Sequence, residues 1–510
     1  MQNRKISFIE GIFSIFALGI TISIFLKAII DVDLNYDVSW YHLPFAARIW
    51  GIIPAESFTS ESKIEFRYDG FPLLAHFFQG LLWKITGRIQ ATNLVGYFSL
   101  IIYFFFLKIY FKIPLYLSAI AIFTIPAVIT HAPTSFVDLP GNIGASVVMM
   151  MGYLFFRQSS LPKRKELLIT FLAAAAAANT KPQLQPLIFI LYWVIGIRLV
   201  WLYFKHTKKI QRKLWQTILL AMIASGLIFF TPIKNVALYG NPFYPIKIEI
   251  AGVILNHKLV PQTYSQGNRP QKWLQSIFEI NTPQWSADQS NDGGDRQLLG
   301  RGGGFFGAYV AFNLLMLVGL SIQEQLAKRE SSGYKSNDAM TALTTILLVS
   351  LIPANFPQSH ELRYFMFWMI TLVSLNLFLV MSLHNNGWGW LKSKLFMLVY
   401  LIFFIVMCIK IRSFYLIKDN RTVESFFKNN LNLELLQHIV PDERNCIISR
   451  HTANPGKSPF AAIQHAFYYS SYFHPEIGYD YSLKTAKSLE SCGNLNVIPQ
   501  DARELFQNVN

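Results

Sequence analysis

Hydrophobic and polar residues alternate along the chain in long blocks. The apolar residues gather in about eleven runs, each approaching the ~20 residues that an α-helix needs to cross a bilayer, and charged residues fall mostly between the runs. The first run, 8–30, is too long for a signal peptide and no A-x-A cleavage site follows it, so it is predicted to be a retained span. The pattern predicts an all-α polytopic membrane protein.

The later runs predict spans that cross the membrane in alternating directions. The densely basic short loops then all fall on one side, which is how Lys and Arg orient membrane proteins. We therefore expect an integral plasma (inner) membrane protein with a cytoplasmic N-terminus. The expected later spans are 93–107, 114–130, 142–156, 167–178, 184–204, 215–230, 305–322, 341–352, 365–383 and 396–411.

The polar stretches divide the chain into two regions. Residues 1–411 are predicted to form the transmembrane domain, with outer loops at 31–92 and 231–304. Residues 412–510 have mixed charge and no span, so they predict a small C-terminal α/β extracytoplasmic domain, with strands near 445–449 and 496–499 and a helix at 422–439. Cys446 and Cys492 both fall there, where a disulfide and two reduced thiols are both open alternatives.

Charge excludes one class of partner. The 45 Lys+Arg against 29 Asp+Glu give a net charge of +16, which could suggest nucleic acid. The basic residues are divided among short loops instead of gathering on one soluble region, which fits contact with membrane lipids. We expect no nucleic-acid binding.

Charged side chains at the outer membrane boundary are the candidates for chemistry, because charge there needs water or a partner. Asp37 opens the first outer loop, ahead of an amphipathic segment predicted to lie in the interface as a helix. Asp138 begins a later span, where it is either a helix N-cap or a second functional carboxylate. Cations near outer span ends either snorkel to headgroups or bind an anion, and they are Lys181, Lys234, Arg269, Arg301 and Arg363.

Several motifs together resemble those of the GT-C fold glycosyltransferases, polytopic enzymes that use polyprenyl-phosphate sugars outside the cytoplasm. The segment Asp37-Val-Ser-Trp-Tyr-His-Leu-Pro is similar to the first acidic motif of that superfamily, and Asp138-Leu-Pro is similar to the second. Gly240-Asn-Pro-Phe-Tyr-Pro245 is similar to a segment of its bacterial members, and Arg363-Tyr364 resembles the arginine aimed at a donor phosphate. The resemblance covers residues 1–411.

The resemblance implies a donor, an acceptor and a set of roles. The donor is a lipid-linked sugar, and the acceptor is a cell-envelope glycan, lipid or protein. Asp37 is the expected catalytic base, with His42 and Asp138 as orienting groups. The groups expected at the donor phosphate are Arg363, Lys181 and Arg301. A divalent cation, Mg²⁺ or Mn²⁺, is a candidate cofactor, but the motif reads Asp-Val where some members have Asp-Glu, so no metal ligand is assigned.

The chemistry needs only one base and some cations. A carboxylate can take the proton of an acceptor hydroxyl, while cations stabilise the leaving phosphate, and direct displacement inverts the anomeric carbon. A transporter or flippase of lipid-linked sugars would place polar residues at mid-membrane, whereas here they collect on one face. An oligosaccharide polymerase or ligase shares the donor class and is the other alternative.

Overall fold

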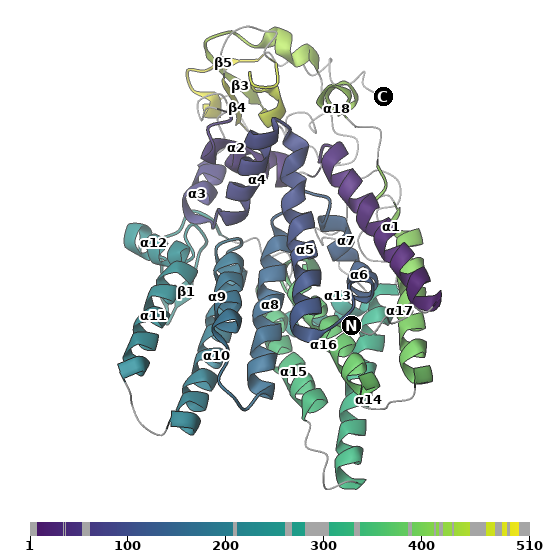
Figure 1. Ribbon diagram of the computed structural model, residues 1–510. Coiled ribbons are helices and arrows are strands. Elements are labelled where there is room, and N and C mark those ends of the chain that lie inside the picture. The colour runs from purple at the N-terminus through teal and green to yellow at the C-terminus, as the bar shows by residue number, and fades with distance from the viewer. Residues whose placement is uncertain are drawn as a thin grey trace.

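The computed structural model is mainly helical, with a bundle of apolar helices covered at one end by two smaller layers (Figure 1). It describes residues 8–33, 35, 37–53, 62–207, 212–260, 268–280, 305–330, 337–385, 390–412, 415–417, 422–430, 433–448, 466–474, 482–486 and 490–498.

The bundle consists of helices that follow the predicted spans closely. The first helix has the bounds expected from the apolar run. The bundle helices are α1 (Phe8–Ile30), α5 (Leu94–Phe106), α6 (Leu115–Phe123), α7 (Pro126–His131), α8 (Asp138–Arg157), α9 (Arg164–Ala178), α10 (Leu184–Thr207), α11 (Arg212–Ile228), α14 (Phe305–Glu330), α15 (Asp338–Asn355), α16 (Met366–Asn385) and α17 (Trp390–Lys410).

Length and composition identify the membrane-crossing helices. Within the described part of the chain, six helices are long and apolar enough to span, or seven if α11 and α12 (Phe230–Tyr239), bent by 72°, count as one. Shorter apolar helices cover Met366–Ser382 and Leu395–Lys410. The expected span 114–130 is broken between α6 and α7 at Ile125, whose extended backbone is what a following proline favours. The polytopic membrane character is confirmed, and the span count of about eleven stays a prediction.

The centre of the bundle is α8, which packs against α5, α9, α10 and α16. Small residues allow close approach to α9, since a Cβ at Gly144 would meet the Ala173 carbonyl oxygen at 2.9 Å. The N-terminal end of α8 points toward the outer layer, which is where Asp138 lies.

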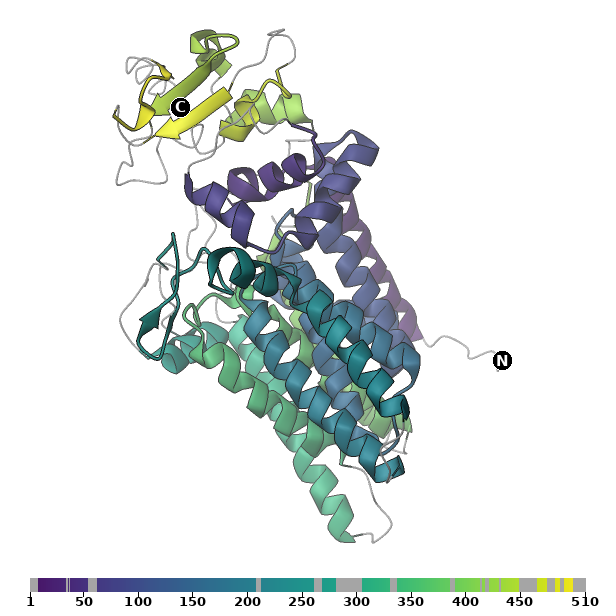
Figure 2. The same cartoon turned by 90° about the vertical axis from the view of Figure 1, so that its left-hand side faces the viewer.

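The first outer loop forms the layer directly above the bundle (Figure 2). The amphipathic segment is helical as predicted, but Phe45 is buried, with its ring 5.2 Å from that of Tyr68 and 5.4 Å from that of His76. The apolar face of α2 therefore packs on protein at Phe45. The elements of the layer are η1 (Val38–His42, a π-helix), α2 (Leu43–Ile49), α3 (Ser62–Gly70), α4 (Leu74–Thr86) and η3 (Ile89–Asn93).

The second outer loop and the segment before α16 supply short elements. The β1–β2 pair is an antiparallel hairpin, and η6 is one turn of 3₁₀-helix at the outer mouth of α16. The elements are β1 (Glu249–Ile250), β2 (Val253–Ile254), α13 (Arg269–Phe278) and η6 (Leu362–Tyr364).

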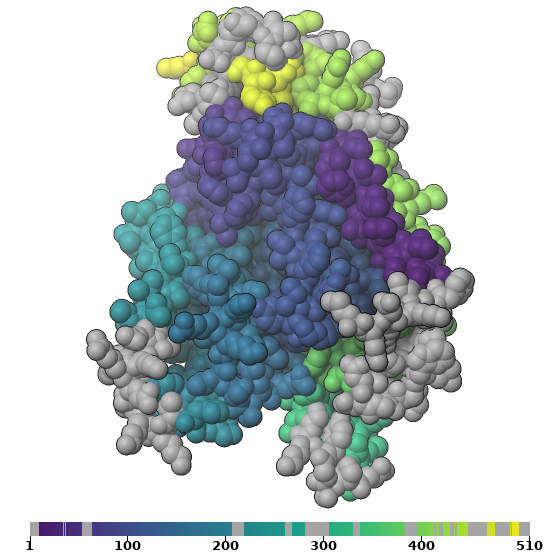
Figure 3. All heavy atoms as spheres, viewed as in Figure 1, coloured from purple at the N-terminus to yellow at the C-terminus, as the bar shows by residue number. Residues whose placement is uncertain are grey.

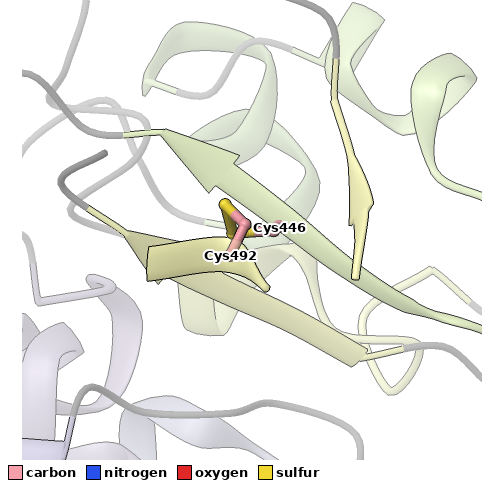
Figure 4. Close-up of a disulfide and its surroundings, with 2 residues drawn as sticks. All are labelled: Cys446 and Cys492. Atoms are coloured by element: carbon pink, nitrogen blue, oxygen red, sulfur yellow. A yellow bond between two sulfur atoms is a disulfide. The ribbon is translucent and has the colours of Figure 1, made fainter. Parts of the chain in front are cut away.

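The C-terminal segment contains a parallel three-stranded sheet in the order β4-β3-β5. The helix expected at 422–439 is split into an α-helix and a 3₁₀-helix. Cys446 and Cys492 form a disulfide that joins β3 to η11 (Figure 4), which decides between the two alternatives for these cysteines. The elements are α18 (Val423–Asn430), η8 (Leu433–His438), β3 (Arg444–Ile448), η9 (Ala466–Tyr469), β4 (Ser482–Ala486), η11 (Glu490–Cys492) and β5 (Asn496–Val497).

An outer apolar cluster joins the C-terminal segment to the first outer loop. Buried side chains from both contribute to it, and the Tyr468 hydroxyl donates to the Asp33 carbonyl oxygen at 3.4 Å. The space-filling view shows the C-terminal segment seated on this layer (Figure 3). The cluster includes Val32, Val38, Leu43, Ala47, Trp83, Ile89, Phe426, Phe427, Phe467 and Tyr468.

Candidate active site

Asp37 and Arg363, singled out separately in the sequence, form an ion pair in the structure. Arg363 Nη1 donates to Asp37 Oδ2 at 2.8 Å, although the residues are 326 positions apart. Their side chains are only 20% and 12% exposed, respectively, so the pair is partly shielded from water. Asp37 is placed by the end of α1 and the start of η1, and Arg363 by η6.

Arg363 has two further neighbours from its own turn. Its Nε lies 3.7 Å from Glu361 Oε2, and its Nη2 donates to the Tyr364 hydroxyl at 3.3 Å. Burial raises the pKa of the Tyr364 phenol, against the lowering effect of the Arg363 charge, so this hydroxyl stays neutral. Arg363 therefore lies between the Asp37 carboxylate and the Glu361 and Tyr364 side chains of its own turn.

Asp138 forms a second ion pair, with Lys181 of the turn between α9 and α10. It is the first residue of α8, and no side-chain hydrogen bond caps that helix, so the N-capping interpretation is wrong. The Asp138 side chain is almost fully buried, and its Oδ2 has no hydrogen-bond partner among the described residues.

Tyr364 connects the two ion pairs. Lys181 Nζ lies 4.1 Å from the centroid of its ring, and Arg363 Cζ lies 5.1 Å from the same centroid. Both cations are therefore attracted to one aromatic ring. The carboxylates and cations of this region form one outer charge cluster, consisting of Asp37, Asp138, Lys181, Glu361 and Arg363.

Asn142 fixes the spacing of the cluster. Its Nδ2 donates to the carbonyl oxygens of Asp138, at 2.8 Å, and Arg363, at 3.1 Å. Its Oδ1 accepts from the Phe367 backbone N–H at 2.9 Å. One buried amide therefore ties the start of α8 to the turn that carries Arg363, which makes Asn142 a positioning residue.

Burial changes the protonation of Lys181. It lowers the pKa of the ammonium group to about 8, and the Arg363 charge acts in the same direction while Asp138 opposes it. The ammonium is therefore charged at pH 7 and loses its proton as the pH rises through 8. The cluster has three carboxylates and, near neutral pH, two cations.

His42 contacts another histidine that the sequence did not single out. Its Nδ1 lies 2.8 Å from His76 Nε2, and the two rings stack. Burial is the main cause that lowers the pKa of both imidazoles, to about 3 for His76, so both are neutral near pH 7. The proposed orienting role of His42 stays a prediction.

The remaining candidates lie apart from the cluster. Lys234 donates to the Asp69 carbonyl oxygen, and Arg269 Nη1 donates to the Asn355 carbonyl oxygen at 3.1 Å. Each cation therefore links its own segment to the backbone of another segment. Arg301, predicted to contact the donor phosphate, lies outside the described residues.

The aspartates near Asp37 have structural partners. Asp31 pairs with Lys27 at 2.7 Å. Asp33 accepts hydrogen bonds from the Ser135 and Asn35 backbone N–H groups. Asp37 differs from both, because its partner, Arg363, is 326 positions away in the sequence.

Sequence reasoning missed Glu361, His76 and Asn142. Glu361 stood beside Arg363 in the same motif, which was a usable signal, whereas nothing in sequence distinguishes His76 or Asn142 from other polar residues near span ends. Within the described ranges, no group of three or more His, Cys, Asp or Glu side chains could hold a metal ion, so no residues are assigned to Mg²⁺ or Mn²⁺.

Comparisons with known proteins add one likeness. No family model matches the chain, and no curated protein matches it in sequence. Among solved structures it is similar to the crystal structure of ArnT from Cupriavidus metallidurans in the apo state, at 12% sequence identity and a TM-score of 0.38, over 98% of this chain and 91% of that chain. A TM-score of 0.38 carries no functional inference, so the function proposed for this chain rests on its own residues.

Proposed function

We propose that this chain is a membrane glycosyltransferase that moves a sugar from a polyprenyl-phosphate donor to an acceptor on the outer side. The observation that carries the proposal is the Asp37–Arg363 pair, a carboxylate and a guanidinium brought together at the outer ends of apolar helices. A lipid-borne donor and a water-borne acceptor can meet only at such a boundary. The acceptor is a glycan, lipid or protein.

Asp37 supplies the base. The acceptor oxygen attacks the anomeric carbon, and its proton passes to the Asp37 carboxylate and then to water. The bond between the anomeric carbon and the phosphate oxygen breaks, and its electron pair stays on the phosphate. A single displacement of this kind inverts the anomeric configuration.

Arg363 and Lys181 stabilise the leaving phosphate. Guanidinium groups bind phosphate through two parallel hydrogen bonds, and a partly desolvated lysine adds a point charge. Both cations lie beside Tyr364, so one phosphate can contact both. Asp138 Oδ2 is buried and has no hydrogen-bond partner among the described residues, so in this proposal it is an acceptor left over beside Lys181.

The donor phosphate and Asp37 compete for the same guanidinium. Arg363 is paired with Asp37 at 2.8 Å, so the carboxylate oxygen that would take the acceptor's proton is occupied by the guanidinium. When a phosphate takes the guanidinium, the carboxylate is released and can face the acceptor hydroxyl. In this proposal the base is therefore available chiefly when the donor is bound.

The number of spans and their orientation in the membrane are part of the same proposal. The joined ends of α8 and α9 and the far end of α14 lie opposite the outer layer (Figure 1). We propose about eleven spans, with the broken α6–α7 pair and the bent α11–α12 pair each crossing once, a cytoplasmic N-terminus and an extracytoplasmic C-terminal segment.

The position of the charges favours an enzyme over a flippase. Inside the bundle, α14, α16 and α17 are joined by uncharged polar groups, where Asn376 and Tyr400 donate to Asn313 Oδ1 at 3.0 and 2.9 Å. Transporters place their binding sites near the bilayer midplane. The outer charge cluster lies instead at one end.

The direct test uses purified protein and a panel of polyprenyl-phosphate sugars, with released polyprenyl phosphate as the product measured. We expect release from at least one donor, faster when an acceptor is present. Movement of intact donor across vesicle membranes with no release from any donor would favour a flippase and contradict the proposal.

A further inference from the structure

A cavity separate from the outer charge cluster lies where the end of α4 and η3 meet the C-terminal segment. Its volume is about 320 Å³, within the roughly 300–1,000 Å³ typical of small-molecule sites. One wall comes from the first outer loop and the other from residues near α18 and η9. The side chains that matter here are Trp83, Arg88, Gln90, Thr422, Tyr472 and Phe473.

Three aromatic rings hold one another in place in this cavity. The Trp83 centroid lies 5.7 Å from that of Tyr472 and 6.3 Å from that of Phe473, and the Tyr472 and Phe473 centroids are 5.0 Å apart. Trp83 is buried, whereas Tyr472 is 40% exposed. Tyr472 therefore offers an aromatic surface at the opening that its two neighbours hold rigid.

The polar groups of the cavity are mostly donors. The Gln90 side chain is buried, and its amide offers both donors and an acceptor. The Arg88 guanidinium donates through Nη2 to the Ile29 carbonyl oxygen at 2.9 Å, and it has five N–H groups in total. Thr422 Oγ1 accepts from the Ser425 backbone N–H at 3.0 Å, so its own O–H can donate. No lining residue in the described part is acidic.

This combination matches a sugar ring better than other ligands. A pyranose has apolar C–H faces, which pack on aromatic rings, and hydroxyls around its edge, which bind amide and guanidinium groups. A lipid tail would leave the Gln90 amide unsatisfied, at a cost. A phosphate would call for more than the one cation present.

We propose that this cavity binds a sugar ring of the acceptor, which makes the acceptor a glycan or glycolipid. The assignment of this sugar to the acceptor rests on the proposed transferase function, while the binding of a sugar does not. Trp83 belongs to the same outer apolar cluster as Val38, the neighbour of Asp37. The cavity and the base are therefore carried by elements that share one apolar cluster.

The test measures sugar binding by the full-length protein in nanodiscs on a panel of immobilised oligosaccharides containing hexoses, pentoses or amino sugars. Wild type is expected to bind at least one of them. Tyr472→Ala and Gln90→Ala are each expected to weaken that binding about tenfold, from loss of a ring contact or a hydrogen bond. Tyr472→Phe keeps the ring and is expected to bind like wild type.

Leu433→Ala, which changes an exposed apolar residue of the C-terminal segment away from the cavity, is the matched control and is expected to bind like wild type. The proposal is overturned if wild type binds no oligosaccharide, if the alanine variants bind like wild type, or if Leu433→Ala loses binding equally. Donor cleavage by water, measured in parallel, is expected to be the same in wild type and Leu433→Ala. Absence of cleavage with every donor would contradict the transferase function and leave the sugar-binding result intact.

Discussion

In the proposed reaction Arg363 pairs first with the Asp37 carboxylate and then with the donor phosphate. It pairs with Asp37 at 2.8 Å, and its Cζ lies 5.1 Å from the centroid of the Tyr364 ring. A planar guanidinium can grip a phosphate with two hydrogen bonds while keeping its other contacts, which an ammonium cannot do.

Substitution of Arg363 is expected to separate charge from geometry. Arg363→Lys keeps the charge and should retain partial turnover, whereas Arg363→Ala should lose most of it and also bind donor weakly. Donor affinity and polyprenyl phosphate release are the measurements. Near-normal values in both variants would reduce Arg363 to a headgroup contact.

Lys181 is expected to set the alkaline limit of activity. Because its pKa is lowered to about 8, chiefly by burial, the charged form that binds phosphate disappears as the pH rises through that value. The profile of kcat/KM against pH, which reports the free enzyme, should therefore fall above about pH 8. Lys181→Arg should move the fall to higher pH, and an unchanged alkaline limb in that variant would refute the role of Lys181.

The site residues were partly predictable from sequence. Asp37, Asp138, Lys181 and Arg363 stand out because ionisable groups at span ends need a reason. Their pairing did not follow, because a contact over 326 positions depends on which helices pack together.

Among the elements, the packing of α2 on α4 places Asp37. The two helices approach so closely that a Cβ at Gly80 would lie 2.3 Å from the Ala46 carbonyl oxygen and 2.4 Å from Trp50 Cδ1. Only glycine fits there. The position of η1, and with it Asp37, depends on this contact.

Gly80→Ala is expected to destabilise the outer layer. Overpacking of this kind typically costs about 1–3 kcal/mol, so the melting temperature in detergent should fall and turnover should drop with it. Gly19→Ala is the control, because a Cβ there meets nothing within 4 Å and alanine favours a helix. Equal melting temperatures for both variants would show that α2 can move without cost.

Sequence patterns predicted elements well where one signal dominated. Long apolar runs gave α1 and α8 to within a few residues. The break at Ile125, the π-helical turn η1 and strand β4 were missed, because tertiary packing decides such local departures. The Cys446–Cys492 disulfide could not be assigned from the sequence either, because it depends on how β3 and η11 meet.

At the scale of the whole molecule, the protein is layered. Apolar helices hold a charge cluster at their outer ends, the first outer loop covers it, and the C-terminal segment covers that loop (Figures 1 and 2). This order makes functional sense only if the C-terminal segment and the acceptor share a compartment.

A topology test follows from that layering. A reporter active only in the cytoplasm, fused after Asn510, should give no signal, and the same reporter fused after Leu161 should be active, because basic loops stay inside. A strong signal from the Asn510 fusion would place the charge cluster on the wrong side for its proposed donor.

Asp37→Asn tests the central claim most directly. The change keeps the size of the side chain but removes its basicity, so turnover measured by polyprenyl phosphate release should fall by the ~10²–10⁴-fold typical of a general base. Donor binding should stay equal or tighten, because the carboxylate that competes for Arg363 is gone.

Asp69→Asn, at an exposed position, should behave like wild type. Asp33→Asn should lose stability before turnover, since Asp33 accepts backbone hydrogen bonds. Wild-type turnover in Asp37→Asn, or loss of turnover in a stably folded Asp33→Asn instead, would contradict the assignment of Asp37 as the base.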